Sequence, residues 1–204
     1  LLVLDSGGQY LDGTTDITRT IAIGTPPRDA CEAFTRVLAG MIAMSRLRWP
    51  AGLAGSHIEA VGRMPLWLAG QDFDHGLGHG VGAYLSVHEG PQRLSRISHV
   101  PLEPGMILSN EPGYYREGAF GIRIENLVMV KAIKKPKAWE REMLGFETLT
   151  CAPFDLALVE PKLLDAHEIT WINDYHAWVY KSLSKGVDKQ AAAWLKKATR
   201  PLKR

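Results

Sequence analysis

The chain has 204 residues, of which 46% are hydrophobic and 23% are charged, with 20 Gly and 12 Pro. This length and composition can bury a substantial core, which excludes a disulfide-dependent mini-protein, a disordered chain and a fibrous repeat. The formal net charge is +2 at pH 7, but residues 181–204 hold eight Lys or Arg and one acidic residue, Asp188. The rest of the chain is therefore mildly acidic, which argues against a nucleic-acid-binding surface built into the fold.

The cysteines and the apolar runs bear on the compartment. Cys31 and Cys151 are far apart and form no disulfide framework, which favours a reducing compartment such as the cytoplasm. No uninterrupted apolar run approaches the roughly 20 residues of a membrane span, and we expect neither a membrane nor a nucleic acid as partner. The first four residues already resemble a strand, with no initiator Met before them, so we expect the chain to be part of a longer protein.

The first third of the chain predicts two strands and then two helices. Residues 1–4 are an apolar run that predicts a buried strand, closed by turn residues at 5–8. Residues 17–23 are rich in β-branched side chains and alternate in polarity, as in a half-buried strand. A Thr-Pro pair before apolar residues at helical spacing predicts a helix over 25–48. A capping-box pattern predicts a second helix over 56–65, because proline ends most helices.

Strands predominate in the middle of the chain. Residues 70–90 are rich in glycine, which argues against a helix there. A Pro-Gly turn leads into a predicted strand over 106–109, and 121–133 is the longest strand candidate. A further short strand is expected over 146–151. Together these elements predict an α+β fold with an antiparallel sheet and helices on one side.

The C-terminal part predicts a helix and a basic tail. Asp165 and Glu168 have capping-box spacing, and apolar residues recur after them at helical spacing. No linker divides the chain. We therefore expect one domain over 1–184, followed by a basic C-terminal tail over 185–204 that is helical or frayed.

Four acidic residues stand where a carboxylate is costly. Asp5 ends an apolar strand and Asp16 opens a β-branched one, while Glu111 follows a predicted strand and Glu125 lies within another. A buried carboxylate must be paired, protonated or bound to metal. Each acid taken alone is explained by a local solution, such as an ion pair between Glu125 and Arg123. Taken with one histidine, the four could instead hold two divalent cations, whose positive charge would balance theirs.

Such a ligand set has a defined chemistry. Four carboxylates with one imidazole and no thiolate favour hard to borderline ions such as Mn²⁺, Co²⁺ or Zn²⁺ over soft ones. Two of these ions roughly 3.5 to 4 Å apart can share a water molecule, lower its pKa and polarise a carbonyl group. The set therefore predicts hydrolysis.

The glycine-rich segment contains three histidines within fourteen positions, His75, His79 and His88. The spacing is not that of a helical zinc pair, because glycine is a poor helix former, and it matches no phosphate-binding loop. Glycine here allows the backbone to approach a bound group closely. A lone histidine is usually structural, but three in this setting indicate a site. The remaining histidines are interpreted as structural or surface residues: His57, His99, His167 and His176.

Five ordered blocks carry a family likeness. They read DSGGQY (5–10), TDITRT (15–20), HGLGHGVGAYLSVHEGP (75–91), NEPGYY (110–115) and GIRIEN (121–126). In these blocks the chain resembles Xaa-Pro aminopeptidase (aminopeptidase P) of the pita-bread metallopeptidases, closest to the cytosolic, long-form type. The resemblance covers almost the whole chain. It implies a pita-bread fold that is N-terminally incomplete here, and a homodimer in the full-length protein.

The resemblance also implies the metal ligands. In such a site Asp5 binds one ion, Asp16 and Glu125 bridge both, and His79 and Glu111 bind the other. The ions implied are two divalent metals, above all Mn²⁺. This set consists of the four acids described above and one of the three histidines of the glycine-rich segment.

The implied reaction is hydrolysis of the bond between an N-terminal residue and a following proline. Glu111 would be the catalytic proton shuttle, while His75 and His88 would bind the substrate and stabilise the oxyanion. Arg123 would position neighbouring ligand carboxylates, or form a plain ion pair. The chain has Leu77 at a position where members of this family often have a small polar residue. A substrate-binding histidine of the family precedes the first metal-binding strand, so we expect the fragment alone to be impaired.

Two alternatives accompany this hypothesis. An Xaa-Pro dipeptidase (prolidase) shares the fold and cleaves dipeptides rather than longer peptides. A non-catalytic pita-bread module that binds peptides or histones is the other, although such modules typically lose metal ligands and all five positions are filled here.

Overall fold

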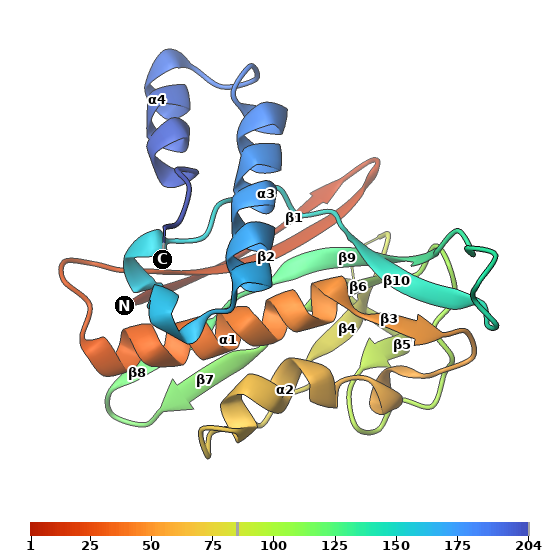
Figure 1. Cartoon of the computed structure of the whole chain (residues 1–204). Helices are drawn as coiled ribbons and strands as arrows, with labels where there is room; N and C mark the ends of the chain where they lie inside the picture. The colour runs from red at the N-terminus through yellow and green to blue at the C-terminus, as the bar shows by residue number, and fades with distance from the viewer. Residues whose placement is uncertain (85, 204) are drawn as a thin grey trace.

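The computed structural model describes residues 1–84 and 86–203 of the chain (Figure 1). Its strands are β1 (Leu2–Tyr10), β2 (Gly13–Ile21), β3 (Arg48–Pro50), β4 (Gly78–Val81), β5 (His88–Leu94), β6 (Ile107–Asn110), β7 (Gly113–Arg116), β8 (Phe120–Arg123), β9 (Asn126–Ala132) and β10 (Met143–Thr148). Its helices are α1 (Arg28–Arg46), α2 (Ala60–Trp67), α3 (Ala166–Leu183) and α4 (Lys189–Ala198), with short 3₁₀ turns η1 (Gly55–His57), η2 (Leu156–Leu158) and η3 (Pro161–Leu163).

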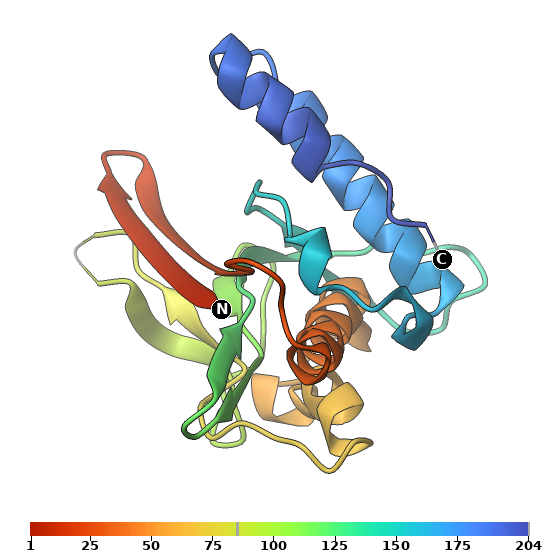
Figure 2. The ribbon, with the colours of Figure 1, turned by 90° about the vertical axis from the view of Figure 1, so that its left-hand side faces the viewer.

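Six strands form the central antiparallel sheet, in the order β3-β10-β9-β6-β4-β5. Two separate hairpins, β1-β2 and β7-β8, complete the β structure. Helices α1 and α2 lie on one side of the sheet and the β1-β2 hairpin on the other, while α3 and α4 extend away from the body (Figure 2). The expected antiparallel sheet with flanking helices is confirmed.

Helix α1 supplies the centre of the core. Phe34, Leu38 and Met41 recur at helical spacing on its buried face. They belong to one cluster with the sheet residues Val128 and Val130, which lie two positions apart and therefore share a face of β9. Burial of each such side chain stabilises the fold by roughly 1.5 to 3 kcal/mol. The sheet is thereby fixed against α1.

The first strand differs from the prediction. The residues expected to form a turn at 5–8 are part of β1, which pairs with β2 over its whole length and turns only after Tyr10. Gly7 and Gly8 adopt extended backbone because β2 offers nine paired positions. Leu2 and Leu4 are 45% and 50% exposed, so the prediction of a buried strand here was wrong.

Both predicted N-terminal helices exist with shifted ends. Helix α1 begins at Arg28 with Pro27 as its N-cap rather than at Thr25, and it ends before β3. The second helix, α2, runs over Ala60–Trp67 and contains Pro65 instead of stopping there. Leu66 is fully buried beside this proline, so tertiary packing outweighs the lost helical hydrogen bond.

The long strand expected over 121–133 is broken in two. Strand β8 ends at Arg123 and β9 begins at Asn126, because each half pairs with a different partner. At the break the amide of Glu125 donates to the carbonyl oxygen of Thr18, at 3.0 Å. Glu125 therefore lies at a junction of strands and not within one. The strand expected over 146–151 is β10, which begins and ends three residues earlier.

The C-terminal helices follow the sequence more closely. The capping box of α3 is formed: Asp165 accepts a hydrogen bond from the amide of Glu168, and Glu168 accepts one from that of Asp165, each at 2.7 Å. Helix α4 lies within residues 185–204 and buries Leu195. Within the described parts of the chain, none of the helices has the length and apolar character needed to cross a bilayer.

Gly40 is where helices α1 and α2 approach most closely. A β-carbon on Gly40 would overlap the carbonyl oxygen of Gly62. We predict that Gly40→Ala lowers the free energy of unfolding of the full-length protein by about 1 to 3 kcal/mol, measured by denaturant unfolding. Gly186→Ala is the matched control, because a β-carbon there meets only an ordinary contact, and it should change that energy by less than about 0.5 kcal/mol. Equal effects of the two changes would contradict the close helix contact.

Candidate active site

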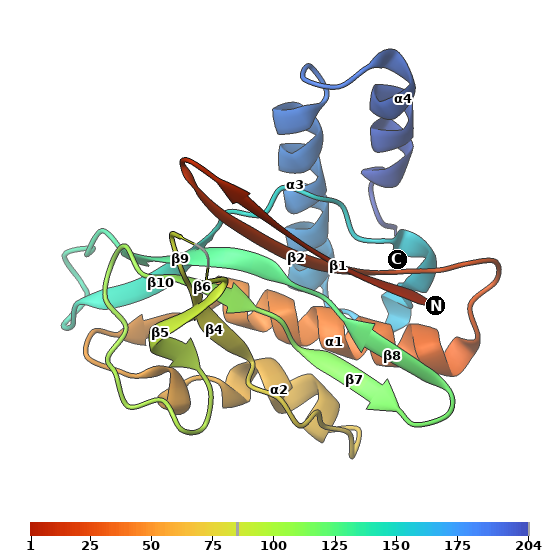
Figure 3. The same cartoon turned by 180° about the vertical axis from the view of Figure 1, so that it is seen from behind.

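The β1-β2 hairpin presents two of the acids together. Asp5 is paired with Thr18, and Gly7 with Asp16, in the antiparallel register. Paired residues share a face of a hairpin, and so do residues two positions apart. Asp5, Asp16 and Thr18 therefore lie on one face (Figure 3 shows this hairpin in front of the sheet).

Glu125 joins this face from the break between β8 and β9. Its carboxylate oxygen Oε2 accepts a hydrogen bond from the Thr18 hydroxyl at 2.7 Å, in addition to the backbone bond between the two residues. The side chain of Glu125 is almost fully buried. The hairpin and the break thus fix one buried carboxylate beside the two hairpin acids.

His79 lies on β4 and Glu111 directly follows β6, which are neighbouring strands of the large sheet. His79 Nε2 lies 3.4 Å from Asp16 Oδ2 and 3.3 Å from Glu111 Oε1. One ligand atom from each of Asp16, His79 and Glu125 lies within 4.8 Å of the others. A cavity of about 500 Å³ is lined by all five residues that the sequence predicts as metal ligands: Asp5, Asp16, His79, Glu111 and Glu125.

The orientation of the His79 ring leaves one nitrogen for a ligand. Its Nδ1 lies 2.9 Å from the carbonyl oxygen of Gly80, and because a carbonyl can only accept, Nδ1 carries the proton of the neutral ring. The lone pair of Nε2 then faces two carboxylates. Burial lowers the pKa of His79, but the protonated ring can donate from Nε2 to Asp16, and this bond with the neighbouring charges outweighs burial and raises the pKa overall.

The acids of the cavity repel one another. Burial, with the charges of Glu111 and Asp16, raises the pKa of Glu125 to about 8, although the bond from Thr18 acts against this. Burial likewise raises the pKa of Glu111, against the opposing effects of His79, Ser109 and Arg123. Without a cation, these carboxylates therefore hold protons at a pH where exposed ones do not.

The donor set fits divalent cations. Oxygen Oε1 of Glu125 is buried and has no hydrogen-bond partner among the described residues. A buried unpaired carboxylate oxygen is costly, as is an imidazole lone pair that faces carboxylates. Cations bound between these atoms would satisfy both and offset the repulsion of the acids. The oxygen-rich set with one imidazole suits Mn²⁺, Co²⁺ or Zn²⁺.

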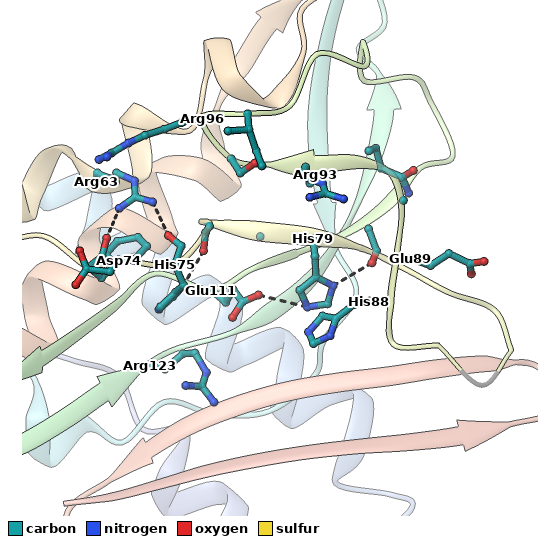
Figure 4. A pocket seen from close by; sticks show the side chains of 18 residues that line it. Arg63, Asp74, His75, His79, His88, Glu89, Arg93, Arg96, Glu111 and Arg123 are labelled. Atoms are coloured by element: carbon teal, nitrogen blue, oxygen red, sulfur yellow. Dashed lines mark hydrogen bonds and ion pairs between the residues drawn. The ribbon is translucent and has the colours of Figure 1, made fainter.

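The other two histidines line an adjoining cavity of about 740 Å³ (Figure 4). His75 Nε2 lies 2.9 Å from the Tyr115 hydroxyl, and its Nδ1 lies 2.7 Å from the carbonyl oxygen of Gly76. Burial lowers the pKa of His75, against the raising effect of that carbonyl. The ring of His88 lies edge-on to that of His79, 4.1 Å between centroids. Both rings therefore border the space beside the proposed metal ligands.

Arg123 pairs with a different acid from the one considered in the sequence. Its Nη2 donates to Asp5 Oδ2 at 2.6 Å, and its Nε donates to the Thr18 hydroxyl at 3.1 Å. It also donates to the Tyr115 hydroxyl at 3.1 Å. No ion pair with Glu125 is found among the described residues, because the strand breaks between the two. Arg123 instead holds Asp5 in place.

Three contributing residues were not identified from the sequence. Thr18 holds Glu125, and Ser109 links the amide of His79 to Glu111 Oε1 through two hydrogen bonds of 2.9 Å. Thr18 and Ser109 each lie two positions from a predicted ligand, and this shared strand face was the signal available. Tyr115, which contacts His75, has no comparable signal because it lies in another hairpin.

Solved structures of peptidases share this arrangement of elements. The X-prolyl aminopeptidase from Caenorhabditis elegans, described as a cytosolic enzyme with a di-nuclear active site, is 38% identical with a TM-score of 0.91. The match covers 98% of this chain and 33% of that one. The prolidase from Pyrococcus horikoshii is 30% identical with a TM-score of 0.62, over 76% of this chain and 41% of that one. The expected pita-bread fold is confirmed by these similarities.

Curated relatives are similar over the full length of the chain. A probable Xaa-Pro aminopeptidase P of Talaromyces marneffei is 49% identical over 210 residues, which cover 100% of this chain and 32% of that protein. The chain therefore spans about a third of the length of this relative.

Family models match in two parts. Residues 142–202 match the C-terminal region of peptidase M24, and residues 1–132 match metallopeptidase family M24. The larger match extends over more than half of the sequence and includes the four carboxylates and both histidines, His79 and His88, that line the smaller cavity. On this basis the chain belongs to metallopeptidase family M24.

Proposed function

We propose that the full-length protein is a dinuclear-metal Xaa-Pro aminopeptidase, which hydrolyses the bond between an N-terminal residue and a following proline. The observation that carries this proposal is the buried Oε1 of Glu125, which has no hydrogen-bond partner in residues 1–84 and 86–203 and lies among the other acids, next to a cavity bordered by His75 and His88. The similarity to a probable Xaa-Pro aminopeptidase P and to an X-prolyl aminopeptidase supports the substrate class.

The proposed metal ligands are five of the residues that line the smaller cavity. Asp5 would bind one ion, Asp16 and Glu125 both, and His79 and Glu111 the other. We propose Mn²⁺, with Co²⁺ or Zn²⁺ as alternatives. When bound, two such ions supply Lewis acidity toward a carbonyl group and lower the pKa of a water molecule.

The chain's own groups would handle the substrate and the proton. The carboxylate of Glu111 borders both cavities, so it can accept a proton from the attacking water and pass it to the departing proline nitrogen. His75 and His88 would bind the peptide and stabilise the negative charge on its carbonyl oxygen. Arg123 and Ser109 would keep Asp5 and Glu111 in position through their hydrogen bonds.

The substrates proposed are peptides with proline at the second position. For the full-length protein we propose a homodimer, which the family resemblance implies. We also propose a cytoplasmic location, since the similar enzyme of Caenorhabditis elegans is described as cytosolic. Prolidases of lower structural similarity share the fold, so peptide length is the property that separates the two activities.

The activity is tested with the full-length protein loaded with Mn²⁺. We expect release of the first residue from an Xaa-Pro-Xaa tripeptide, with kcat at least about 100-fold lower in Glu111→Gln because the proton acceptor is lost. Glu103→Gln is the matched control, since Glu103 is exposed in the turn before β6, and its kcat should be unchanged.

Three results would contradict the proposal. Failure of the wild type to cleave any Xaa-Pro peptide would remove the activity altogether. Cleavage of Xaa-Pro dipeptides alone would identify a prolidase instead. Metal content near zero in the purified full-length protein would favour a non-catalytic peptide-binding module.

The raised pKa of Glu125 predicts a pH dependence of stability in the metal-free protein. The carboxyl group of Glu125 holds a proton up to about pH 8 when folded, whereas its ordinary pKa is 4.5, so the folded state binds more protons than the unfolded state within this window. The free energy of unfolding of chelator-treated full-length protein should therefore fall as the pH rises from 4.5 to 8. The contribution of this one proton approaches about 1.4 kcal/mol per pH unit.

The matched variant is Glu125→Gln, which cannot ionise. In denaturant titrations of this variant, the free energy of unfolding should fall less between pH 4.5 and 8 than it does in the wild type. The variant should also bind less metal per chain, because a bridging carboxylate is lost. Identical pH dependence in the wild type and the variant would show that Glu125 is not the protonated group.

A further inference from the structure

Arg63 is a buried cation outside the set of metal ligands. It lies on α2, and only 3% of its side chain is exposed. Its Nε donates to Glu59 Oε2 at 3.0 Å, and its Nη1 donates to Asp72 Oδ1 at 2.8 Å. Arg96 pairs with the same two acids, so the two arginines and two acids together add no net charge to the cavity that the arginines border.

The same guanidinium also holds the main chain that carries His75. Its Nη1 donates to the carbonyl oxygen of Phe73 at 2.7 Å, and its Nη2 donates to that of His75 at 2.6 Å (Figure 4). The guanidinium carbon lies 3.9 Å from the centroid of the Phe73 ring. That ring in turn packs against the His75 ring, at 4.7 Å between centroids. Arg63 thus contacts His75 through its backbone and through the neighbouring aromatic ring.

The segment needs such a support. Residues 71–77 form neither helix nor strand between α2 and β4, and Gly76 follows His75 directly. A loop without ladder hydrogen bonds is ordered only by specific contacts, and glycine increases its freedom. The planar guanidinium presents several donors in a fixed geometry, which suits two carbonyl groups at once.

We propose that Arg63 is the positioning residue for His75: it fixes the main chain of 73–75 so that the imidazole faces the cavity beside the metal ligands. The catalytic part of this inference rests on the proposed function, whereas the structural part does not. Misplacement of a substrate-binding group by about 1 Å costs on the order of 100-fold in rate, so the contact has consequences for turnover.

Arg96 offers a matched control on the same acids. Its Nε lies 3.3 Å from Glu59 Oε1, and its Nη2 donates to Asp72 Oδ2 at 3.1 Å. Its side chain is 61% exposed, and it has no hydrogen bond to the carbonyl groups of 73–75 within the described parts of the chain. Removal of Arg96 therefore disturbs the acids without releasing the segment.

The test uses Arg63→Lys in full-length protein loaded with Mn²⁺, because lysine keeps the charge but offers one nitrogen in place of the planar fork. Hydrogen–deuterium exchange should become faster in peptides covering 72–77 and stay unchanged in α1 and α3. The kcat/KM for an Xaa-Pro-Xaa tripeptide should fall by about 10- to 100-fold. Arg96→Gln should leave the exchange over 72–77 near that of the wild type.

A double-mutant cycle separates positioning from general destabilisation. In a His75→Ala background, Arg63→Lys should cost less than about 3-fold in kcat/KM, because the group that it positions is already absent. An equal loss in both backgrounds, or unchanged exchange over 72–77, would overturn the proposal. If Arg63→Lys does not fold, Glu59→Gln weakens the anchor of Arg63 and should give the same pattern to a smaller extent.

The two proposals fail in different ways. A wild-type protein without activity on Xaa-Pro peptides would overturn the proposed function, while the exchange measurement on 72–77 would still decide whether Arg63 holds the segment. An active wild type whose exchange and kcat/KM are insensitive to Arg63→Lys would overturn the role of Arg63 alone.

Discussion

Repulsion among buried carboxylates is the constraint on which the rest of the site depends. Asp16, Glu111 and Glu125 border one cavity, and burial together with the charges of neighbouring acids raises the pKa values of Glu111 and Glu125 in the absence of a cation. Hydrogen bonds from Thr18 and Ser109 offset part of this cost; Thr18 lies on the same strand as Asp16, and Ser109 lies on the strand that ends just before Glu111. A cluster of buried acids is stable only where the surrounding structure holds each side chain in place and a cation offsets their repulsion.

The buried cation Arg19 joins the parts that carry these acids. It donates to the carbonyl oxygens of Thr18 and Glu125, at 2.9 and 2.6 Å, and to that of Ala152 at 2.8 Å. Its guanidinium also lies over the Phe154 ring and bonds the Tyr175 hydroxyl of α3. Arg19 therefore joins the C-terminal region to the hairpin and to the strand break, which carry these acids. Arg19 and Arg63 act alike in this respect, because each donates to more than one main-chain carbonyl group.

How far the sequence leads can be seen from individual residues. The acids were identifiable because a carboxylate at a strand end or within an apolar run is energetically unfavourable unless it has a partner. Thr18 was within reach through its spacing from Asp16. Arg63 was not, because a basic residue on a short amphipathic helix ordinarily faces solvent, and nothing local indicates that it bonds a segment about ten residues further along. Asp5 was identified, but its ion pair with Arg123 was not, because one strand was expected where there are two and the ion pair considered there was with Glu125.

The sequence by itself determined the elements whose signals are local: the amphipathic α1, the capping box of α3, the glycine-rich segment that forms no helix, and the blocks that indicate the family. Only the tertiary structure decided where strands begin, break and pair. The turn expected at 5–8 became strand because β2 supplied a partner, and the strand expected over 121–133 broke because its halves pair with β7 and with β6 and β10. Strand pairing joins residues far apart in the chain, so its energy cannot be read from a local window. The geometry of the acids depends on that pairing, which is why the sequence indicated these acids but not the arrangement that holds them.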